Sequence, residues 1–472
     1  MKDALLIVGS IFYATSAFAQ QRPNVVLIVA DDMRCSTLEF LGEEKVKTPV
    51  LNRFSDDCSI FTNAHIMGGT SGAVSMPSRA MLMTGKHLYK LEKQGETIPD
   101  EHTMIGEMLG NAGYQTFHTG KWHNGKEVFN RCFNSGKDIF FGGMADHWNV
   151  PLFAYDPSGK YDNKRRVIEK PFENNEVKIL TGEYSYSGKH SVDIFTETAV
   201  EFINEQKDKQ KPFFLSLCYM SPHDPRSMPE EFMQMYRASD IDLPPNFMEK
   251  HPFDNGDMEI RDEVLASIPR VKSEIQKHIA EYYAMISHLD NRIGNVLEAL
   301  KNNGLYENTI VIFIADNGLA VGQHGLMGKQ NVYEHSIKVP LMIKEAKTNA
   351  QKAYFEQLCY LIDLFPTICE WTGLPVPGSV DGVSLLPVIR ENKPVRDYLY
   401  YGYRDFQRAI SNGKWKLIEY NVKGVKTTQL FDLEEDPYEI KNLINDTKYK
   451  NEIKRLKEEI KHQQIKTGDR IL

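Results

Sequence analysis

Four apolar segments, each of the length of one buried strand, alternate along this chain with helix-like segments. They are Asn24 to Ala30, Gly113 to Thr119, Pro212 to Tyr219 and Thr309 to Ala315, and a long amphipathic segment, Ser273 to Leu300, precedes the last. Continuous apolar runs separated by helices are typical of parallel strands buried on both faces. We therefore expect an α/β fold with a large, mostly parallel mixed sheet that helices cover on both faces.

Each of the four segments runs into polar residues. In order, these are Asp31 and Asp32; Lys121, Trp122 and His123; His223 and Asp224; and Asp316 and Asn317. One polar residue after a strand usually just begins a solvated loop. In an open parallel sheet, however, the carboxyl ends of the strands form the crevice in which ligands bind. Four such groups therefore predict a ligand site at one edge of the sheet.

The polar residues fall into two chemical sets. Asp31, Asp32, Asp316 and Asn317 offer hard oxygen ligands that suit Ca²⁺ or Mg²⁺. Crowded carboxylates repel one another and tend to take up protons unless a cation lies among them. The second set consists of donors that suit a tetrahedral oxyanion: Arg79, Lys121, His123, His223 and Lys329. A hard cation beside such donors is suited to holding a sulfate or phosphate ester for displacement.

Ser75 to Arg79, Ser-Met-Pro-Ser-Arg, has the pattern of a turn into a helix. Pro77 suits the first helical turn, and Gly85 suits a left-handed C-terminal stop. Ser75 would then face the unpaired amides of a helix start, which attract anions, and Arg79 adds positive charge one turn later.

With these motifs, the chain resembles the formylglycine-dependent (type I) sulfatases of the alkaline phosphatase superfamily. The signature is the segment Ser75 to Gly85, SMPSRAMLMTG, in which only Met83 departs from the preferred leucine. The other matching motifs occur in the expected order: Val29-Ala30-Asp31-Asp32, Gly120-Lys121-Trp122-His123, Ser221-Pro222-His223, Ala315-Asp316-Asn317-Gly318, Gly328-Lys329-Gln330, and Leu430-Phe431-Asp432-Leu433 with Asp436-Pro437.

The resemblance implies that Ser75 is oxidised to formylglycine (3-oxoalanine) by a dedicated maturase, of the radical type for a serine, acting before export. The hydrated aldehyde supplies one oxygen to attack sulfur and a second whose deprotonation expels sulfate. An unmodified serine would remain as a sulfate ester with no internal route to release.

The resemblance also implies a role for each matching residue. Asp31, Asp32, Asp316 and Asn317 are expected to bind one Ca²⁺ per chain, in preference to Mg²⁺, with the oxygen of residue 75 or the substrate sulfate completing the shell. Arg79 and Lys121 would hold formylglycine and neutralise sulfate, and His123 would take the proton when sulfate is expelled. His223 and Lys329 would bind the substrate and protonate or stabilise the leaving oxygen.

The expected substrate is a sulfated carbohydrate, by the same resemblance. Asp224 and Arg226 are candidates for contacts with sugar hydroxyls or a uronate. Residues expected at the mouth of the site are Trp122, Asn124, His147, Trp148, Gln323 and His324.

Composition excludes other classes of partner. The 472 residues carry a formal charge of −8 without a basic tract, so we expect no nucleic-acid partner.

Residues 1–19 combine Lys2, an apolar stretch and Ala17-Phe18-Ala19, which indicates a signal peptide cleaved near Ala19 and export to the periplasm or medium. A short membrane anchor is the alternative, but the run is too short for stable membrane insertion. The six cysteines lack a Cys-x-x-Cys pair, so we expect mostly buried thiols, with pairing of some after export left open.

The catalytic domain is expected to span residues 20–392, and a smaller C-terminal subdomain residues 393–472. In the latter, Arg408 to Ile410 and Trp415 to Ile418 read as antiparallel strands, and Lys448 to Gln463 reads as a charged helix.

Two competing functions remain. A phosphoesterase of the same superfamily would use unmodified Ser75, but such enzymes usually bind two metals through several histidines, which do not cluster that way here. A glycan-binding pseudoenzyme would have lost a metal carboxylate or a donor, and none is missing from the sequence.

Overall fold

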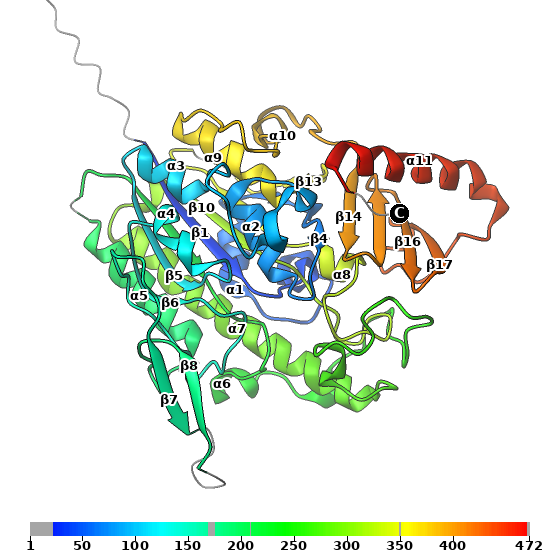
Figure 1. Cartoon of the computed structure of the whole chain (residues 1–472), viewed down its shortest axis with the longest axis horizontal. Coiled ribbons are helices and arrows are strands. Elements are labelled where there is room, and N and C mark those ends of the chain that lie inside the picture. Colours follow the sequence, from blue (N-terminus) through cyan, green and yellow to red (C-terminus); the bar gives the residue numbers. More distant parts are fainter. Residues whose placement is uncertain (1–21, 169–174, 208, 349–350, 470–472) are drawn as a thin grey trace, which may run out of the picture.

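The computed structural model describes residues 22–168, 175–207, 209–348 and 351–469 (Figure 1). The predicted signal peptide lies outside these residues. No helix in the described ranges combines the length and apolar character needed to cross a bilayer.

An eight-stranded sheet forms the centre of the molecule, in the order β12-β2-β11-β10-β1-β9-β5-β6. Pairing is parallel except on the two sides of β11, which confirms the mostly parallel mixed sheet. The strands are β12 (Ala353–Phe355), β2 (Ser59–Phe61), β11 (Leu341–Lys344), β10 (Thr309–Ala315), β1 (Asn24–Ala30), β9 (Phe213–Cys218), β5 (Gln115–Lys121) and β6 (Ser135–Phe140).

The central strands are buried because their side chains are apolar on both faces. Every residue of β1 and β10 is buried, and the two strands pair in register from Asn24 with Thr309 to Ala30 with Ala315. Consequently both strands end at the same level, and the residues that follow them meet at one edge.

Helices cover both faces of this sheet. Figure 1 shows α5 (Ser191–Glu205) and α7 (Lys272–Asn302) along one side and α2 (Ser75–Thr84), α3 (Ile105–Asn111) and α9 (Leu364–Thr372) toward the other. Five further α-helices in the described ranges are short: α1 (Pro49–Ser55), α4 (Phe129–Cys132), α6 (Glu230–Met233), α8 (Glu334–Ile337) and α10 (Leu386–Glu391). The predicted stop of α2 is confirmed, since Gly85 has φ 64°.

A smaller sheet lies beside the large one, with α11 (Lys450–Thr467) packed along it (Figure 1). Its order is β17 (Val425–Asp432), β16 (Trp415–Val422), β15 (Gln407–Ser411), β14 (Leu399–Tyr403) and β4 (Gly68–Gly69). Leu456 and Ile460 of α11 bury the apolar face of its antiparallel strands. The fifth strand, β4, comes from the segment before Ser75 and pairs in parallel with β14.

Two small pairs complete the described strands: β3 (Ala64–His65) with β13 (Cys359–Tyr360), and the hairpin of β7 (Lys164–Ile168) and β8 (Val177–Thr181), which projects from the body in Figure 1. All six cysteines are free and buried, which confirms the expectation of buried thiols.

Candidate active site

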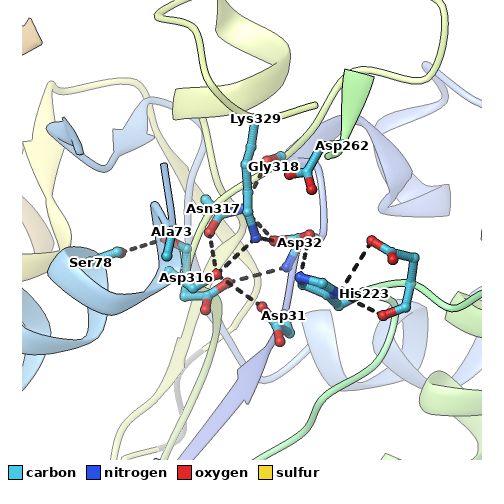
Figure 2. Close-up of polar contacts among 12 residues, drawn as sticks. Asp31, Asp32, Ala73, Ser78, His223, Asp262, Asp316, Asn317, Gly318 and Lys329 are labelled. Carbon is cyan, nitrogen blue, oxygen red and sulfur yellow. Dashed lines mark hydrogen bonds and ion pairs between the residues drawn. The ribbon is translucent and has the colours of Figure 1, made fainter. Parts of the chain in front are cut away.

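Three aspartates meet at the carboxyl edge of the large sheet (Figure 2). Asp31 and Asp32 follow β1, and Asp316 follows β10. One carboxylate oxygen of each lies within 4.8 Å of the other two, and all three residues are buried. The predicted convergence of these residues is therefore present.

The backbone around Asp32 is held in an unusual conformation. Asp32 has φ 66°, a left-handed value that aspartate tolerates better than most residues. Its N–H donates to Oδ1 of Asp316 at 3.2 Å, and the hydroxyl of Tyr282 donates to its carbonyl oxygen at 2.7 Å. Nδ2 of Asn317 donates to its Oδ1 at 2.6 Å. These contacts fix the direction of the carboxylate.

Ser75, the first residue of α2, lies at the centre of the group. Its Oγ is 3.3 Å from Oδ1 of Asp31 and 3.1 Å from Oδ1 of Asn317, and it accepts a hydrogen bond from Nζ of Lys329 at 2.9 Å. The side chain is 1% exposed. The hydroxyl is thus enclosed by both carboxylate and ammonium groups.

Three cations pair with the three carboxylates. Nζ of Lys121 lies 2.5 Å from Asp31, and Nζ of Lys329 lies 2.6 Å from Asp32. Nε of Arg79 donates to Asp316 at 2.8 Å, and Nη1 donates to the carbonyl oxygen of Lys121, also at 2.8 Å. The formal charges of these six side chains cancel.

Burial and charge act in opposite directions on the aspartates. Burial raises the pKa of Asp31, but Lys121 and His223 outweigh it and hold that pKa well below its ordinary value. Burial and the neighbouring charge of Asp31 raise the pKa of Asp316 to about 6. Burial also lowers the pKa of the Lys121 ammonium group, and the attraction of Asp31 only partly offsets this.

This donor set fits a divalent cation. Asp31, Asp32, Asp316 and Asn317 present only oxygen ligands, the type that Ca²⁺ and Mg²⁺ prefer. Because the six charges already cancel, a bound divalent ion would leave the site with two positive charges, which suits an anionic ligand.

His223 lies beside Asp32, with Nε2 3.7 Å from its Oδ2. Nδ1 is 2.7 Å from the backbone oxygen of Asp224, whose carboxylate forms a bidentate ion pair with Arg261. His123 makes no hydrogen bond to these groups within the described chain. It lies close enough that burial, and then Lys121 and Arg79, lower its pKa well below the ordinary value.

Arg226, the other predicted substrate contact, lies against α7. Its Nη1 is 2.8 Å from Nδ1 of His278. Arg226 and Asp224 therefore lie in the same segment as His223 but contact different partners.

The expected mouth residues serve mainly in packing, so that expectation was wrong for five of the six. Trp122 is 1% exposed and packs edge-on against Phe129 and Phe133. The amide groups of Asn124 and Gln323 bond to backbone atoms, His147 bonds to Ser191 and to the carbonyl of His223, and His324 stacks on Tyr333. Only Trp148 is partly exposed. Backbone atoms and the Ser191 hydroxyl pair with most of these polar groups, while Oδ1 of Asn124 has no partner among the described residues.

Several contributors lack a local sequence signal. Tyr282 looks like an ordinary core position of an amphipathic helix, yet it binds the backbone of Asp32. Arg261 joins Asp224 to Asp262, and Asp262 accepts from the side chain of Gln330 at 2.7 Å. Arg261 and Asp262 belong to a mostly irregular segment before α7, and only long-range contacts place them at the site.

Comparison with known families gives two matches. The family model described as "Sulfatase" matches residues 23–374, well over half of the chain. A second model, "N-sulphoglucosamine sulphohydrolase, C-terminal", matches residues 322–466.

Individual proteins agree with these matches. An arylsulfatase of Clostridium perfringens is 29% identical over 92% of this chain and 92% of its own length. A multifunctional alkaline phosphatase superfamily protein of Trinickia caryophylli is 28% identical over 91% and 92%. A solved structure in complex with its substrate D-glucosamine-2-N,6-O-disulfate superposes with a TM-score of 0.76 at 21% identity, covering 95% of this chain and 99% of that one.

Proposed function

The chain belongs to the sulfatase family, within the alkaline phosphatase superfamily, and from this membership and the geometry at Ser75 we propose that it hydrolyses a sulfate ester of a sulfated carbohydrate. The observation that carries the proposal is the position of Ser75. Its Oγ lies within hydrogen-bonding distance of the Asp31 carboxylate, the Asn317 amide oxygen and Nζ of Lys329. A nucleophile in this position has cationic groups around it to receive the sulfate.

Residue 75 is proposed to act as formylglycine, formed from Ser75 by a maturase. Hydrated formylglycine would supply the attacking oxygen and a second oxygen through which sulfate is expelled. The buried position of Ser75 suits a residue that reacts only with a bound ester.

One Ca²⁺ per chain is proposed between Asp31, Asp32, Asp316 and Asn317. When bound there, it would neutralise charge on the sulfate oxygens. The support is the set of buried oxygen ligands, whose three carboxylates form ion pairs with Lys121, Lys329 and Arg79.

The side chains around residue 75 are proposed to divide the remaining work. Arg79 and Lys121, both buried, orient residue 75 and neutralise the sulfate. His223 and Lys329 stabilise or protonate the leaving oxygen, and His123 accepts the proton released when sulfate departs. Proton transfer by a positioned histidine typically contributes about 100- to 10,000-fold to the rate. A His223→Ala variant should therefore show a larger fold decrease in kcat than fold increase in KM.

The carbohydrate class is supported by the rim beside His223. Asp224, Arg261 and Asp262 there present hydrogen-bonding groups that suit hydroxyls. The C-terminal match to a sugar sulphohydrolase model points the same way. Export, with cleavage near Ala19, remains part of the proposal, and sequencing the N-terminus of the secreted protein tests it.

A phosphoesterase that uses unmodified Ser75 is the second candidate, favoured by the alkaline phosphatase superfamily relative. Trypsin should release residue 75 in the peptide Phe54 to Arg79, which contains no internal lysine or arginine. Protein co-produced with a maturase should give this peptide about two hydrogens lighter than encoded, because an alcohol has become an aldehyde. It should also release sulfate from defined sulfated mono- and disaccharides. An intact serine in protein that cleaves phosphate esters quickly but no sulfate ester would favour the phosphoesterase.

A further inference from the structure

Two arginines flank the segment that carries His223, and they differ in how their charge is balanced. Arg261 contacts the residue directly after His223, and Arg226 lies three residues after it. The negative charges of Asp224 and Asp32 both act on Arg226, which places its guanidinium group close to the His223 segment. Their partners decide which of the two can accept an anion.

Arg261 is already neutralised. Its guanidinium group pairs with both oxygens of Asp224, and Nη2 also donates to Oδ1 of Asp262 at 2.6 Å. The three side chains together carry one negative charge. An anionic group of a substrate would be repelled there, whereas a hydroxyl would find acceptors.

Arg226 has no such partner. Among the described residues, no carboxylate oxygen lies within 4.0 Å of its guanidinium nitrogens, and its buried Nε has no hydrogen-bond partner. Its Nη1 contacts Nδ1 of His278. Burial, and then the charge of Arg226, lower the pKa of His278 to about 4, so this imidazole is neutral and accepts the hydrogen bond.

The carboxylates nearest to Arg226 contact other side chains. Asp224 is held by Arg261, and Glu281 lies 3.8 Å from Lys277 and 4.0 Å from His278. Burial lowers the pKa of the Arg226 guanidinium group, and the attraction of Asp224 and Glu281 does not restore it. A buried guanidinium group left in this condition is costly unless an anion joins it.

We propose that Arg226 binds a second anionic group of the substrate, a carboxylate or a second sulfate, on the saccharide whose ester is cleaved beside His223. The inference rests on the proposed function and narrows its substrate class to saccharides with an additional negative charge. The planar guanidinium group of Arg226 can donate to two oxygens of either anion at once. The carboxylates paired with Arg261 can accept hydrogen bonds from neutral hydroxyls.

The test compares three sulfated disaccharides: one with no other charge, one with an adjacent uronate and one with a second sulfate. The readout is the ratio of kcat/KM for each anionic substrate to that for the neutral one. Wild-type enzyme should favour at least one anionic substrate, and the two anionic arms identify the group. Because a hydrogen bond to a charged group contributes about 1.5–3 kcal/mol, Arg226→Gln should lower this ratio about 10- to 100-fold.

Two further variants separate charge from position. Arg226→Lys keeps the charge without the planar guanidinium group, so its ratio should fall less than that of Arg226→Gln. Arg237→Gln removes an exposed arginine charge outside the proposed site and should leave the ratio within about threefold of wild type. Equal ratios in wild type and Arg226→Gln, or a wild-type preference for the neutral substrate, would overturn the proposal.

Binding distinguishes this proposal from the proposed function. Calorimetry on Ser75→Ala protein, with and without Arg226→Gln, measures the dissociation constants of the same disaccharides. These constants give the preference for anionic over neutral substrate without turnover. If no sulfate is released yet the binding ratio falls as expected, the anion site stands and the sulfatase reaction does not. An unchanged binding ratio rejects the anion site even if sulfate is released.

Discussion

Replacing Glu263 by alanine would remove the acceptor of three buried donors. Its Oε2 accepts from the N–H of Met327 at 2.9 Å and lies 2.5 Å from Nη2 of Arg270, and its Oε1 accepts from the N–H of Gly328 at 3.0 Å. Glu263 and Arg270 are each 2% exposed. The segment that Glu263 holds runs directly into Lys329, which contacts Ser75.

The expected cost is large because the guanidinium group of Arg270 would be left without its carboxylate. Breaking a buried ion pair costs about 3–5 kcal/mol, and unpaired backbone N–H groups contribute to such losses. We therefore expect Glu263→Ala to lower the free energy of unfolding by about 3–5 kcal/mol. Urea denaturation followed by tryptophan fluorescence measures it. The measurement belongs at pH 8, because burial raises the pKa of Glu263 to about 7 and the carboxylate is ionised above that value.

Two variants control this experiment. Glu259→Ala removes an exposed carboxylate from the same segment and should change the free energy by no more than about 0.5 kcal/mol. Adding Arg270→Met to Glu263→Ala removes the unpaired charge, so the double variant should be more stable than the sum of the single effects by at least about 1 kcal/mol. Strict additivity, or a loss below about 1 kcal/mol in Glu263→Ala, would refute the reasoning.

Three further outcomes follow from the structure. Burial raises the pKa of Asp290 from 3.8 to about 7, so the folded state holds an extra proton between these values. The free energy of unfolding should therefore fall as pH rises from about 4 to 7. Urea denaturation of Asp290→Asn should show a smaller fall. Gly120→Ala would place a Cβ 1.9 Å from a carbonyl oxygen of β9, so it should cost about 2–4 kcal/mol in thermal unfolding, whereas Gly113→Ala, at φ 95° in open space, should cost less. Tyr282→Phe removes the hydroxyl bound to Asp32, and calorimetric titration should show Ca²⁺ binding weakened by about 10-fold or more.

Much of the central sheet was predictable because its strands carry a local signal. The expected strands Asn24 to Ala30 and Thr309 to Ala315 have the observed bounds of β1 and β10. The expected strand Gly113 to Thr119 is displaced by two residues, since β5 spans Gln115 to Lys121. Of the residues expected to follow the strand, Lys121 is its last residue, and Trp122 and His123 come after it.

The convergence of Asp31, Asp32 and Asp316 was also predictable, because parallel neighbours end at one edge of the sheet. The loss of five expected mouth residues to the interior was not. His147, for example, is polar and yet fully buried, since a serine and a carbonyl oxygen satisfy both ring nitrogens. Residue type alone does not reveal such partners.

Long-range contacts set the remaining limit. Arg261 and Glu263 act through residues distant in sequence, and no local periodicity marks them. The same is true of Gly68 and Gly69, whose pairing with β14 joins segments more than three hundred positions apart. The division of the chain at residue 393 stays a prediction.

That pairing has a consequence for biosynthesis. Gly68 and Gly69 precede Ser75 by a few residues, and their partner strand, Leu399 to Tyr403, is synthesised more than three hundred residues later. Until the ribosome has supplied it, the segment before residue 75 has no sheet to join. Once the chain has folded, Ser75 is buried and another enzyme cannot reach it. A catalyst that alters residue 75 must therefore work on the nascent or still unfolded polypeptide.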